Sequence, residues 1–345
     1  MTRFLWNIFC FLLWSTQLIR LFRHSKRTKG IILCYGGITE TGKTKQPWNG
    51  DGRYIDKRKL ERQISYLRRH YDIVYPSKIA AAVEKDRAVP EKSAALTFDY
   101  GYMAAYTNVF KRLIENSIPF GFSLVTGLVQ NHELIWYDRL ELAISKARSR
   151  AVRVKVGGSF IDEKTATPRQ KARAYLLLKG VGAVLDVQKR EMFLTEIENQ
   201  AQHTVKDDSD IPDDCAGMTA QEISEVAAGG AEAGSQSAHL VDLMHIARRH
   251  LLEEIYESRH QVSRLTGTDC SYFVYPMWTE GTPDEALVEL VEKSGYSFAL
   301  TNVPAFVEGS SNPYSLPRIT ITGYENFFTF AAKLAGIGLK RNLIR

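Results

Sequence analysis

The chain has 345 residues, of which 44% are hydrophobic and 24% charged, and its formal net charge is +6. This balance excludes an intrinsically disordered chain, and the length is ample for one large core or two modest ones. Basic residues are interleaved with acidic ones and form no dense stripe, so we expect no nucleic-acid partner. The basic excess is compatible with an anionic neighbour such as a membrane surface or an acidic glycan.

Residues 1–29 form a hydrophobic and then basic segment. Residues 4–14 are apolar almost all round, but this run is shorter than the about 20 residues that a spanning helix needs, and no small-residue cleavage site follows. The basic cluster after it comprises Arg20, Arg23, Lys26, Arg27 and Lys29. We therefore expect membrane association, through insertion or a headgroup-level anchor, with the cytoplasmic side favoured. The alternative is an uncleaved tail that packs on the domain.

Residues 30–144 alternate short apolar runs with helical patterns. The runs at 31–38, 93–98 and 118–126 predict strands, and the stretches at 56–70, 77–84 and 103–116 predict helices. Cys34 lies in the first run, where a buried free thiol is expected. The alternation predicts a parallel sheet covered by helices, with the chemistry at the carboxyl ends of the strands. Asp99 stands at such an end.

The rest of the chain divides into two parts. Residues 145–217 predict a helical insertion and linker, with helices near 168–179 and 185–202 and no clear strand. From 218 to 345 the alternation resumes, with a helix over 219–228 that Thr219 and Glu222 begin as a capping box. A long helix is expected over 241–264 and further helices over 283–294 and 325–334, with strands at 271–276, 296–300 and 314–321.

The segments LTFDYGY, PFGFSLVTG, IWYDRLELAI, GSQSAHL, FVYP and SLPRI follow one another between about residues 31 and 330. In this order they resemble the polysaccharide deacetylases of the NodB-homology type. The resemblance implies an α/β fold, a distorted (β/α) barrel with a helical insertion. In that family a T-F-D-D-G motif supplies the catalytic base and one metal ligand, and an H-[ST]-x-x-H segment supplies two further ligands.

Carried over to this chain, the resemblance implies Asp99 as the base. The three metal positions correspond to Tyr100, Gln236 and Leu240. A phenol, an amide and an alkyl chain cannot jointly hold zinc at useful affinity, so we expect no cofactor at these positions.

A shifted metal site is the rival interpretation. His239, Asp242 and His245 would share one face at the start of the expected long helix, and with Asp99 they could bind zinc. Alternatively, His239 is a loop residue, Asp242 an acid in the first helical turn, and His245 an ordinary exposed side chain.

Aromatic and polar residues near the predicted strand ends are candidates for a sugar-binding lining, because aromatic faces stack on pyranose rings while Asp and Arg bind hydroxyls. They are Tyr100, Tyr102, Trp136, Tyr137, Asp138, Tyr275, Trp278 and Arg318. Each also has a structural alternative: Trp136 could cap the barrel, and Arg318 could pair with a carboxylate.

We therefore expect a deacetylase-like protein of cell-surface carbohydrate metabolism that binds a polysaccharide or glycolipid without metal-dependent deacetylation. The alternative is an active carbohydrate deacetylase, a hydrolase of C–N bonds, that uses Asp99 with a site centred on His239. Evolutionary loss and deliberate replacement of the metal ligands would leave the same sequence.

Overall fold

The computed structural model describes residues 3–40, 49–85, 87–131, 134–203, 211–277 and 280–339. Its strands are β1 (Ile31–Tyr35), β2 (Gly37–Thr39), β3 (Tyr54–Asp56), β4 (Asp72–Ile73), β5 (Ser93–Phe98), β6 (Gly121–Leu124), β7 (Ala151–Val156), β8 (Ser159–Lys164), β9 (Glu232–Ser235), β10 (Tyr272–Val274), β11 (Phe298–Leu300) and β12 (Ile319–Ile321).

The α-helices are α1 (Arg3–Ser15), α2 (Ile19–Ser25), α3 (Lys57–His70), α4 (Pro76–Glu84), α5 (Met103–Ala105), α6 (Lys111–Glu115), α7 (Thr126–Asn131), α8 (Trp136–Ser145), α9 (Pro168–Ala183), α10 (Val187–Ala201), α11 (Ala220–Ala228), α12 (Arg248–Leu251), α13 (Ser258–Thr266), α14 (Glu285–Lys293) and α15 (Phe327–Leu334). Short 3-10 and π segments are η1 (Tyr106–Phe110), η3 (Asp213–Cys215), η4 (Leu252–Glu257) and η5 (Pro313–Ser315).

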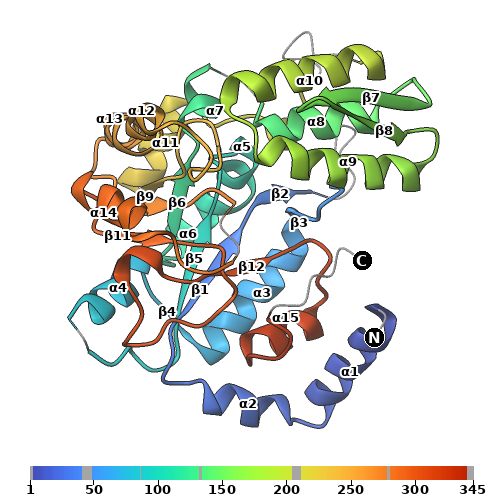
Figure 1. Ribbon diagram of the computed structural model, residues 1–345. Coiled ribbons are helices and arrows are strands. Elements are labelled where there is room, and N and C mark those ends of the chain that lie inside the picture. The colour runs from blue at the N-terminus through green and yellow to red at the C-terminus, as the bar shows by residue number, and fades with distance from the viewer. Residues whose placement is uncertain are drawn as a thin grey trace.

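Eight parallel strands form one sheet in the order β11-β10-β9-β6-β5-β1-β12, with β4 paired to the side of β5. Every residue of β1 and β5 is buried, as expected for strands that helices cover on one face and a packed interior on the other. A parallel bridge between Leu300 and Leu316 brings the two ends of the strand order together. The sheet is therefore curled into a barrel, and the predicted α/β barrel is confirmed (Figure 1).

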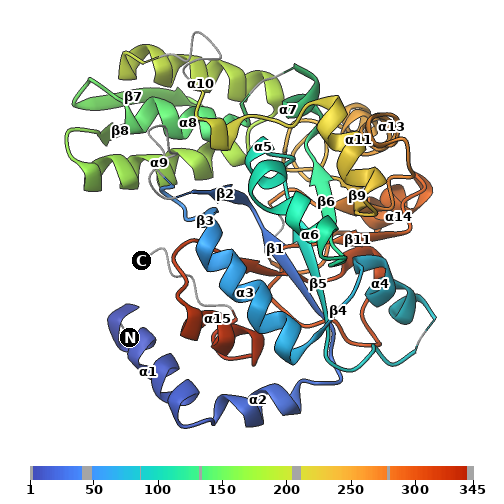
Figure 2. The ribbon, with the colours of Figure 1, turned by 180° about the vertical axis from the view of Figure 1, so that it is seen from behind.

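The insertion packs over the end of the barrel where the parallel strands finish (Figures 1 and 2). It contains the two expected helices, α9 and α10, but also an antiparallel hairpin of β7 and β8. The insertion is therefore not purely helical as predicted. In β7 the buried Val152 and Val154 alternate with exposed residues, which is the pattern of a half-buried strand.

The prediction of one long helix over 241–264 was also wrong at its start, because the helix begins only at Arg248. From there it continues through the π segment η4 into α13. Leu240 has a positive φ of 51°, which a helix does not allow. The Asp242 carboxylate then accepts a hydrogen bond from the Met244 amide at 3.0 Å and forms a local turn. The capping box of α11 is as predicted, with the Thr219 side chain and Glu222 bonded reciprocally.

The first two helices lie at the opposite end of the barrel from the insertion (Figures 1 and 2). α1 packs on α15, where Trp14 lies edge-on to Phe327 at 6.0 Å and Phe11 lies edge-on to Phe328 at 5.1 Å. Within the described residues no single helix is long and apolar enough to cross a membrane, although α1 and α2 together meet those criteria as a pair bent by 82°.

Candidate functional site

Asp99 follows β5 at the carboxyl edge of the sheet, as the sequence predicted, and its residue is 2% exposed. Arg318, which precedes β12 two strands away, grips both carboxylate oxygens, with Nη1 2.7 Å from Oδ1 and Nη2 2.9 Å from Oδ2. A bidentate arginine–carboxylate pair is among the strongest hydrogen-bonded contacts in proteins. The alternative interpretation of Arg318, that it pairs with a carboxylate, is thus confirmed.

Three further side chains donate to Asp99. The Ser123 hydroxyl lies 3.1 Å from Oδ1, and the Cys34 thiol and the Gln236 amide each lie 3.2 Å from Oδ2. Ser123 and Cys34 were not among the sequence candidates for the site. The available signal was a polar or thiol side chain inside an otherwise apolar buried strand, on β6 and β1, which flank β5. Cys34 is a buried free thiol, as expected.

The three positions that the resemblance assigned to metal ligands make other contacts in this structure. Gln236 accepts from the Tyr100 backbone amide at 3.2 Å while it donates to Asp99. Leu240 is 1% exposed, and its carbonyl accepts from Trp136 Nε1 and Arg190 Nη1, each at 3.2 Å. Burial raises the pKa of the Tyr100 phenol well above its ordinary value of 10.0, so the phenol does not supply an anionic oxygen near neutral pH. This donor set does not fit zinc.

The backbone at two of these positions, Tyr100 and Leu240, and at Ser237 beside the third has an unusual conformation. Tyr100, Ser237 and Leu240 have φ angles of 79°, 67° and 51°. Bulky residues seldom adopt positive φ, whereas Asn, Asp and His do so several-fold more often. Such strain is characteristic of functional sites, where side chains must be presented in one direction. Two of the three positions that the resemblance assigns to metal ligands therefore carry a backbone conformation that Asp or His adopts more readily than Tyr or Leu.

The residues of the expected shifted metal site lie in two separate pairs. His239 Nδ1 is 2.7 Å from Oε1 of the buried Glu254, and His245 Nδ1 is 2.8 Å from Oδ2 of Asp242. Asp242 does not begin a helix, so the shared helical face does not exist. No group of three or more His, Cys, Asp or Glu side chains able to hold a metal ion occurs within the described ranges.

The His239–Glu254 pair is partly open to solvent. The His239 side chain is 31% exposed, and the Glu254 carboxylate also accepts from the backbone amides of Ala238 and His239 at 2.9 and 3.0 Å. The hydrogen bond to Glu254 raises the pKa of His239 above its ordinary value of 6.5, although partial burial opposes this. Glu254 was missed in the sequence because only the fold brings η4 beside the loop after β9.

Comparisons with known proteins support this architecture. No protein-family model matches the chain, and no curated protein matches its sequence. Among solved structures, the Streptococcus pyogenes deacetylase PplD in complex with acetate is similar, with a TM-score of 0.54 and 13% identity over 86% of this chain and 93% of that one. The chain has the fold of a polysaccharide deacetylase.

Two further structures agree. IcaB from Ammonifex degensii has a TM-score of 0.54 and 17% identity over 89% of this chain and 97% of that one. BC0361, a polysaccharide deacetylase from Bacillus cereus, has a TM-score of 0.53 and 15% identity over 89% of this chain and 69% of that one. The fold that the resemblance implied is thereby confirmed.

Within this deacetylase fold, most residues of the expected sugar-binding lining are buried. Asp138 is 1% exposed and accepts from the phenols of Tyr102 at 2.5 Å and Tyr54 at 2.9 Å. Tyr102 is fully buried, Trp136 and Tyr137 are nearly so, and Tyr275 is buried with its hydroxyl 3.0 Å from the Tyr314 carbonyl oxygen. Tyr100 alone of the described members is partly exposed. Trp278 lies outside the described residues.

Asp138 belongs to a second buried charge cluster, which joins the barrel to the insertion. Arg53, beside β3, donates to Asp138 and Glu141 of α8 through Nη2 and to Asp51 through Nη1 at 2.5 Å. Lys179 of α9 also donates to Asp51. Burial raises the pKa of Glu141. This Arg53 cluster explains why Asp138 is held inside the protein.

Proposed function

We propose that this chain is a deacetylase-fold protein that binds a polysaccharide or glycolipid without metal-dependent hydrolysis. The observation that carries the proposal is the closed hydrogen-bond set of Asp99. Its two oxygens accept five hydrogen bonds, from Arg318 twice and from Ser123, Cys34 and Gln236. An ionised carboxylate offers about four lone-pair sites, so this one is saturated.

A saturated and buried carboxylate is a poor general base. To take a proton from an attacking water, Asp99 would have to release one of its donors and admit that water to a side chain that is 1% exposed. The amide of Gln236, at a position that corresponds to one of the family's metal ligands, instead donates to Asp99 Oδ2 at 3.2 Å. The polar network therefore favours a stabilising role for Asp99.

Two observations support glycan binding at the carboxyl edge of the barrel. Solved structures with this fold include a protein described as a polysaccharide deacetylase, and the insertion covers the edge where such barrels carry their sites. Tyr100 and His239, which follow β5 and β9, are the sequence candidates at that edge with partly exposed side chains. We infer that they contact the sugar, the phenol ring by stacking and the imidazole by hydrogen bonding.

The direct test measures metal content and activity on the purified full-length chain. We expect less than stoichiometric zinc, no acetate release from N-acetylated oligosaccharides, and chemical-shift or calorimetric signals of binding to the same sugars. Tyr100→Ala should weaken sugar binding, whereas Tyr256→Ala, a change at an exposed tyrosine of η4, should not. Stoichiometric zinc, with acetate release that a chelator abolishes, would refute the proposal.

A gain-of-function variant tests whether the ligand geometry persists. Tyr100→Asp, Gln236→His and Leu240→His together restore one carboxylate and two imidazoles at positions whose backbone already suits two of them. We expect this triple variant to bind about one equivalent of zinc, in the manner of a three-ligand open site. The single variant Gln236→His is the matched control and should bind none.

The alternative function is hydrolysis centred on His239. It is favoured by the buried Glu254, which orients the imidazole as the third member of a catalytic triad does. It predicts that His239→Ala and Asp99→Asn each abolish acetate release by a folded protein. Absence of acetate release from the wild type, or equal activity in all three proteins, would exclude it.

A further inference from the structure

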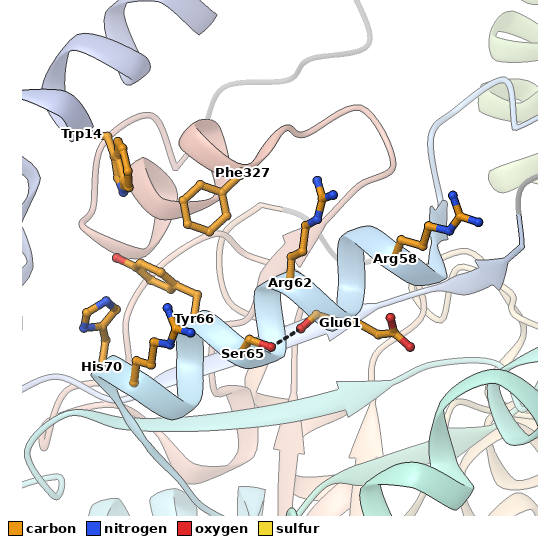
Figure 3. Close-up of a pocket in the computed structure, with 9 residues that line it drawn as sticks. Trp14, Arg58, Glu61, Arg62, Ser65, Tyr66, His70 and Phe327 are labelled. Carbon is orange, nitrogen blue, oxygen red and sulfur yellow. Dashed lines mark hydrogen bonds between the residues drawn. The ribbon is translucent and has the colours of Figure 1, made fainter.

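An open groove of about 690 Å³ lies on the outside of the barrel, at the end away from the insertion (Figure 3). The exposed side of α3 forms its floor, and Trp14 of α1 and Phe327 of α15 form a wall. Its lining residues are Trp14, Arg58, Glu61, Arg62, Ser65, Tyr66, Arg69, His70 and Phe327. The groove is thus separate from the Asp99 centre.

The charge of this groove is strongly positive. Arg58, Arg62 and Arg69 are exposed, and none of their side chains forms an ion pair or hydrogen bond within the part of the chain that the structure describes. The one carboxylate of the lining, Glu61, already pairs with Arg112. Guanidinium groups spaced along one helix face are therefore available to an anionic ligand.

α2 adds to the positive potential. Its Arg23 donates to the Tyr66 hydroxyl at 2.8 Å, which fixes α2 beside the groove. Residues 1–39 contain six Lys or Arg and no Asp or Glu. Partial burial and the charges of Arg23, Arg20 and Arg69 lower the pKa of His70, which also lines the groove.

An exposed apolar surface adjoins the groove. One side of α1 is buried through Trp6, Cys10 and Leu13. Large hydrophobic side chains are exposed to solvent on the other side of α1, in the turn that follows it, and on helix α2. The exposed ones are Phe4, Leu5, Ile8, Phe9, Phe11, Leu12, Leu18, Leu21 and Phe22, with exposed fractions between 41% and 71%. So many neighbouring apolar side chains are unusual on a free surface and indicate an interaction site.

We propose that this end of the barrel docks on a membrane leaflet rich in anionic lipid. The exposed hydrophobic side chains of α1 and α2 enter the interface, and Arg58, Arg62 and Arg69 bind lipid phosphates at the headgroup level. The occupant is a lipid surface because the two features occur together: an apolar face for acyl chains and uncompensated arginines beside it. The contact leaves the insertion and the Asp99 edge free to face a glycan.

The test is co-sedimentation of the full-length protein with vesicles. We expect binding to phosphatidylcholine vesicles that contain about a third phosphatidylserine, weak binding to pure phosphatidylcholine, and loss of binding as salt rises. Each arginine removed from the groove should weaken the partition coefficient about fivefold, so that Arg62→Ala with Arg69→Ala weakens it about 25-fold. Arg68→Ala is the matched control, because Arg68 is exposed on the same helix but does not line the groove.

The apolar face needs its own variants. Leu12→Glu with Leu21→Glu should abolish vesicle binding, since both side chains are more than half exposed and would carry charge into the interface. Met192→Glu on the insertion, where Met192 is 69% exposed, should leave binding unchanged. Circular dichroism checks that all variants are folded.

Several outcomes would overturn the proposal. Equal binding to neutral and anionic vesicles, or unchanged binding by Arg62→Ala with Arg69→Ala, would remove the arginines from the contact. Inhibition by millimolar inorganic phosphate at constant ionic strength would indicate a site for free phosphate. A dimer in sedimentation velocity that Leu12→Glu with Leu21→Glu dissociates would assign the apolar face to a second copy of the chain.

Discussion

The Asp99 centre and the Arg53 cluster are two buried charge groups of one barrel, yet they are balanced differently. Asp99 and Arg318 are one anion and one cation, and neutral side chains donate the remaining hydrogen bonds to the carboxylate. The Arg53 cluster holds three carboxylates, those of Asp51, Asp138 and Glu141, against two cations, Arg53 and Lys179. The first group is neutral, and the second has a formal charge of −1 when all its groups are ionised.

The Asp99–Arg318 pair and the Arg53 cluster also stabilise different parts of the molecule. Asp99 and Arg318 lie inside a single layer of strands, so their pair locks the barrel itself. The Arg53 cluster connects the loop between β2 and β3 to α8 and α9, so it holds the insertion on the barrel. Within this cluster burial raises the pKa of Glu141, whereas at Asp51 the opposing effect of burial is outweighed by Arg53 and Lys179, which lower the pKa.

The largest effect is expected from Arg318→Met. This change leaves the buried Asp99 without its cation, and removal of one partner of a buried pair costs about 3–5 kcal/mol of unfolding free energy. Urea denaturation measures it. In the Asp99→Asn background the same substitution should cost much less, and Arg68→Met, at an exposed and unpaired arginine, should change stability by under about 0.5 kcal/mol. If Arg318→Met lowered the unfolding free energy equally in the wild-type and Asp99→Asn backgrounds, Asp99 and Arg318 would not act as a pair.

Arg53→Met should cost less, about 3 kcal/mol, because Lys179 remains as a second cation. The loss of unfolding free energy relative to the wild type should shrink as pH falls from about 7 to about 5. Carboxylates without their cation take up protons, so the folded variant then binds more protons than its unfolded state. Limited proteolysis should cut the insertion faster than the barrel. A protease pattern identical to that of the wild type would show that the cluster does not hold the insertion.

Lys179→Met should have a smaller effect, about 1–2 kcal/mol, because it removes one charged hydrogen bond to Asp51. The pKa of Asp51 lies below its ordinary value of 3.8, so its contribution to stability is present above that pH and is lost as pH falls through the lower folded value. Acid unfolding should therefore be less steep in the variant. Lys171→Gln serves as a control, because in the described part of the chain Lys171 donates to two backbone carbonyls and to no carboxylate.

Much of this architecture was predictable from the sequence. Short hydrophobic runs such as 31–35 and 93–98 predict buried strands, and both runs form fully buried strands in the structure. The errors have local physical causes. The β7–β8 hairpin was missed because its exposed positions carry charges. A helix was wrongly expected from 241, because the positive φ of Leu240 depends on contacts of its carbonyl with Trp136 and Arg190, which are distant in the sequence.

Only part of the site was predictable, because its residues lie far apart in the sequence. Asp99 stands in a contiguous motif, and its role as a sheet-edge carboxylate follows from that motif. Its partners Cys34, Ser123 and Arg318 come from separate strands, and only the sheet order places them together. The same holds for Glu254, which meets His239 from a π segment that no periodicity indicates.

The smallest effect concerns His239 and Glu254, a pair at the same barrel edge that is partly open to solvent. His239→Gln should cost about 0.5–1 kcal/mol at about pH 6, less than either buried group, because water screens the imidazole, whose side chain is 31% exposed. The pKa of His239 is raised in the folded state, so its contribution is complete below its ordinary pKa of 6.5 and is lost as pH rises through the raised value.

Urea unfolding of the wild type and His239→Gln across this range measures the difference directly. We expect the two stabilities to converge by about pH 9, where the imidazole is neutral in both folded and unfolded chains. His245→Gln is the control, because it removes an imidazole that pairs with Asp242 but is itself 57% exposed, and it should cost less stability at about pH 6 than His239→Gln. A stability gap that widens with pH would mean that His239 is neutral in its contact with Glu254, and burial would then outweigh pairing at this edge as well.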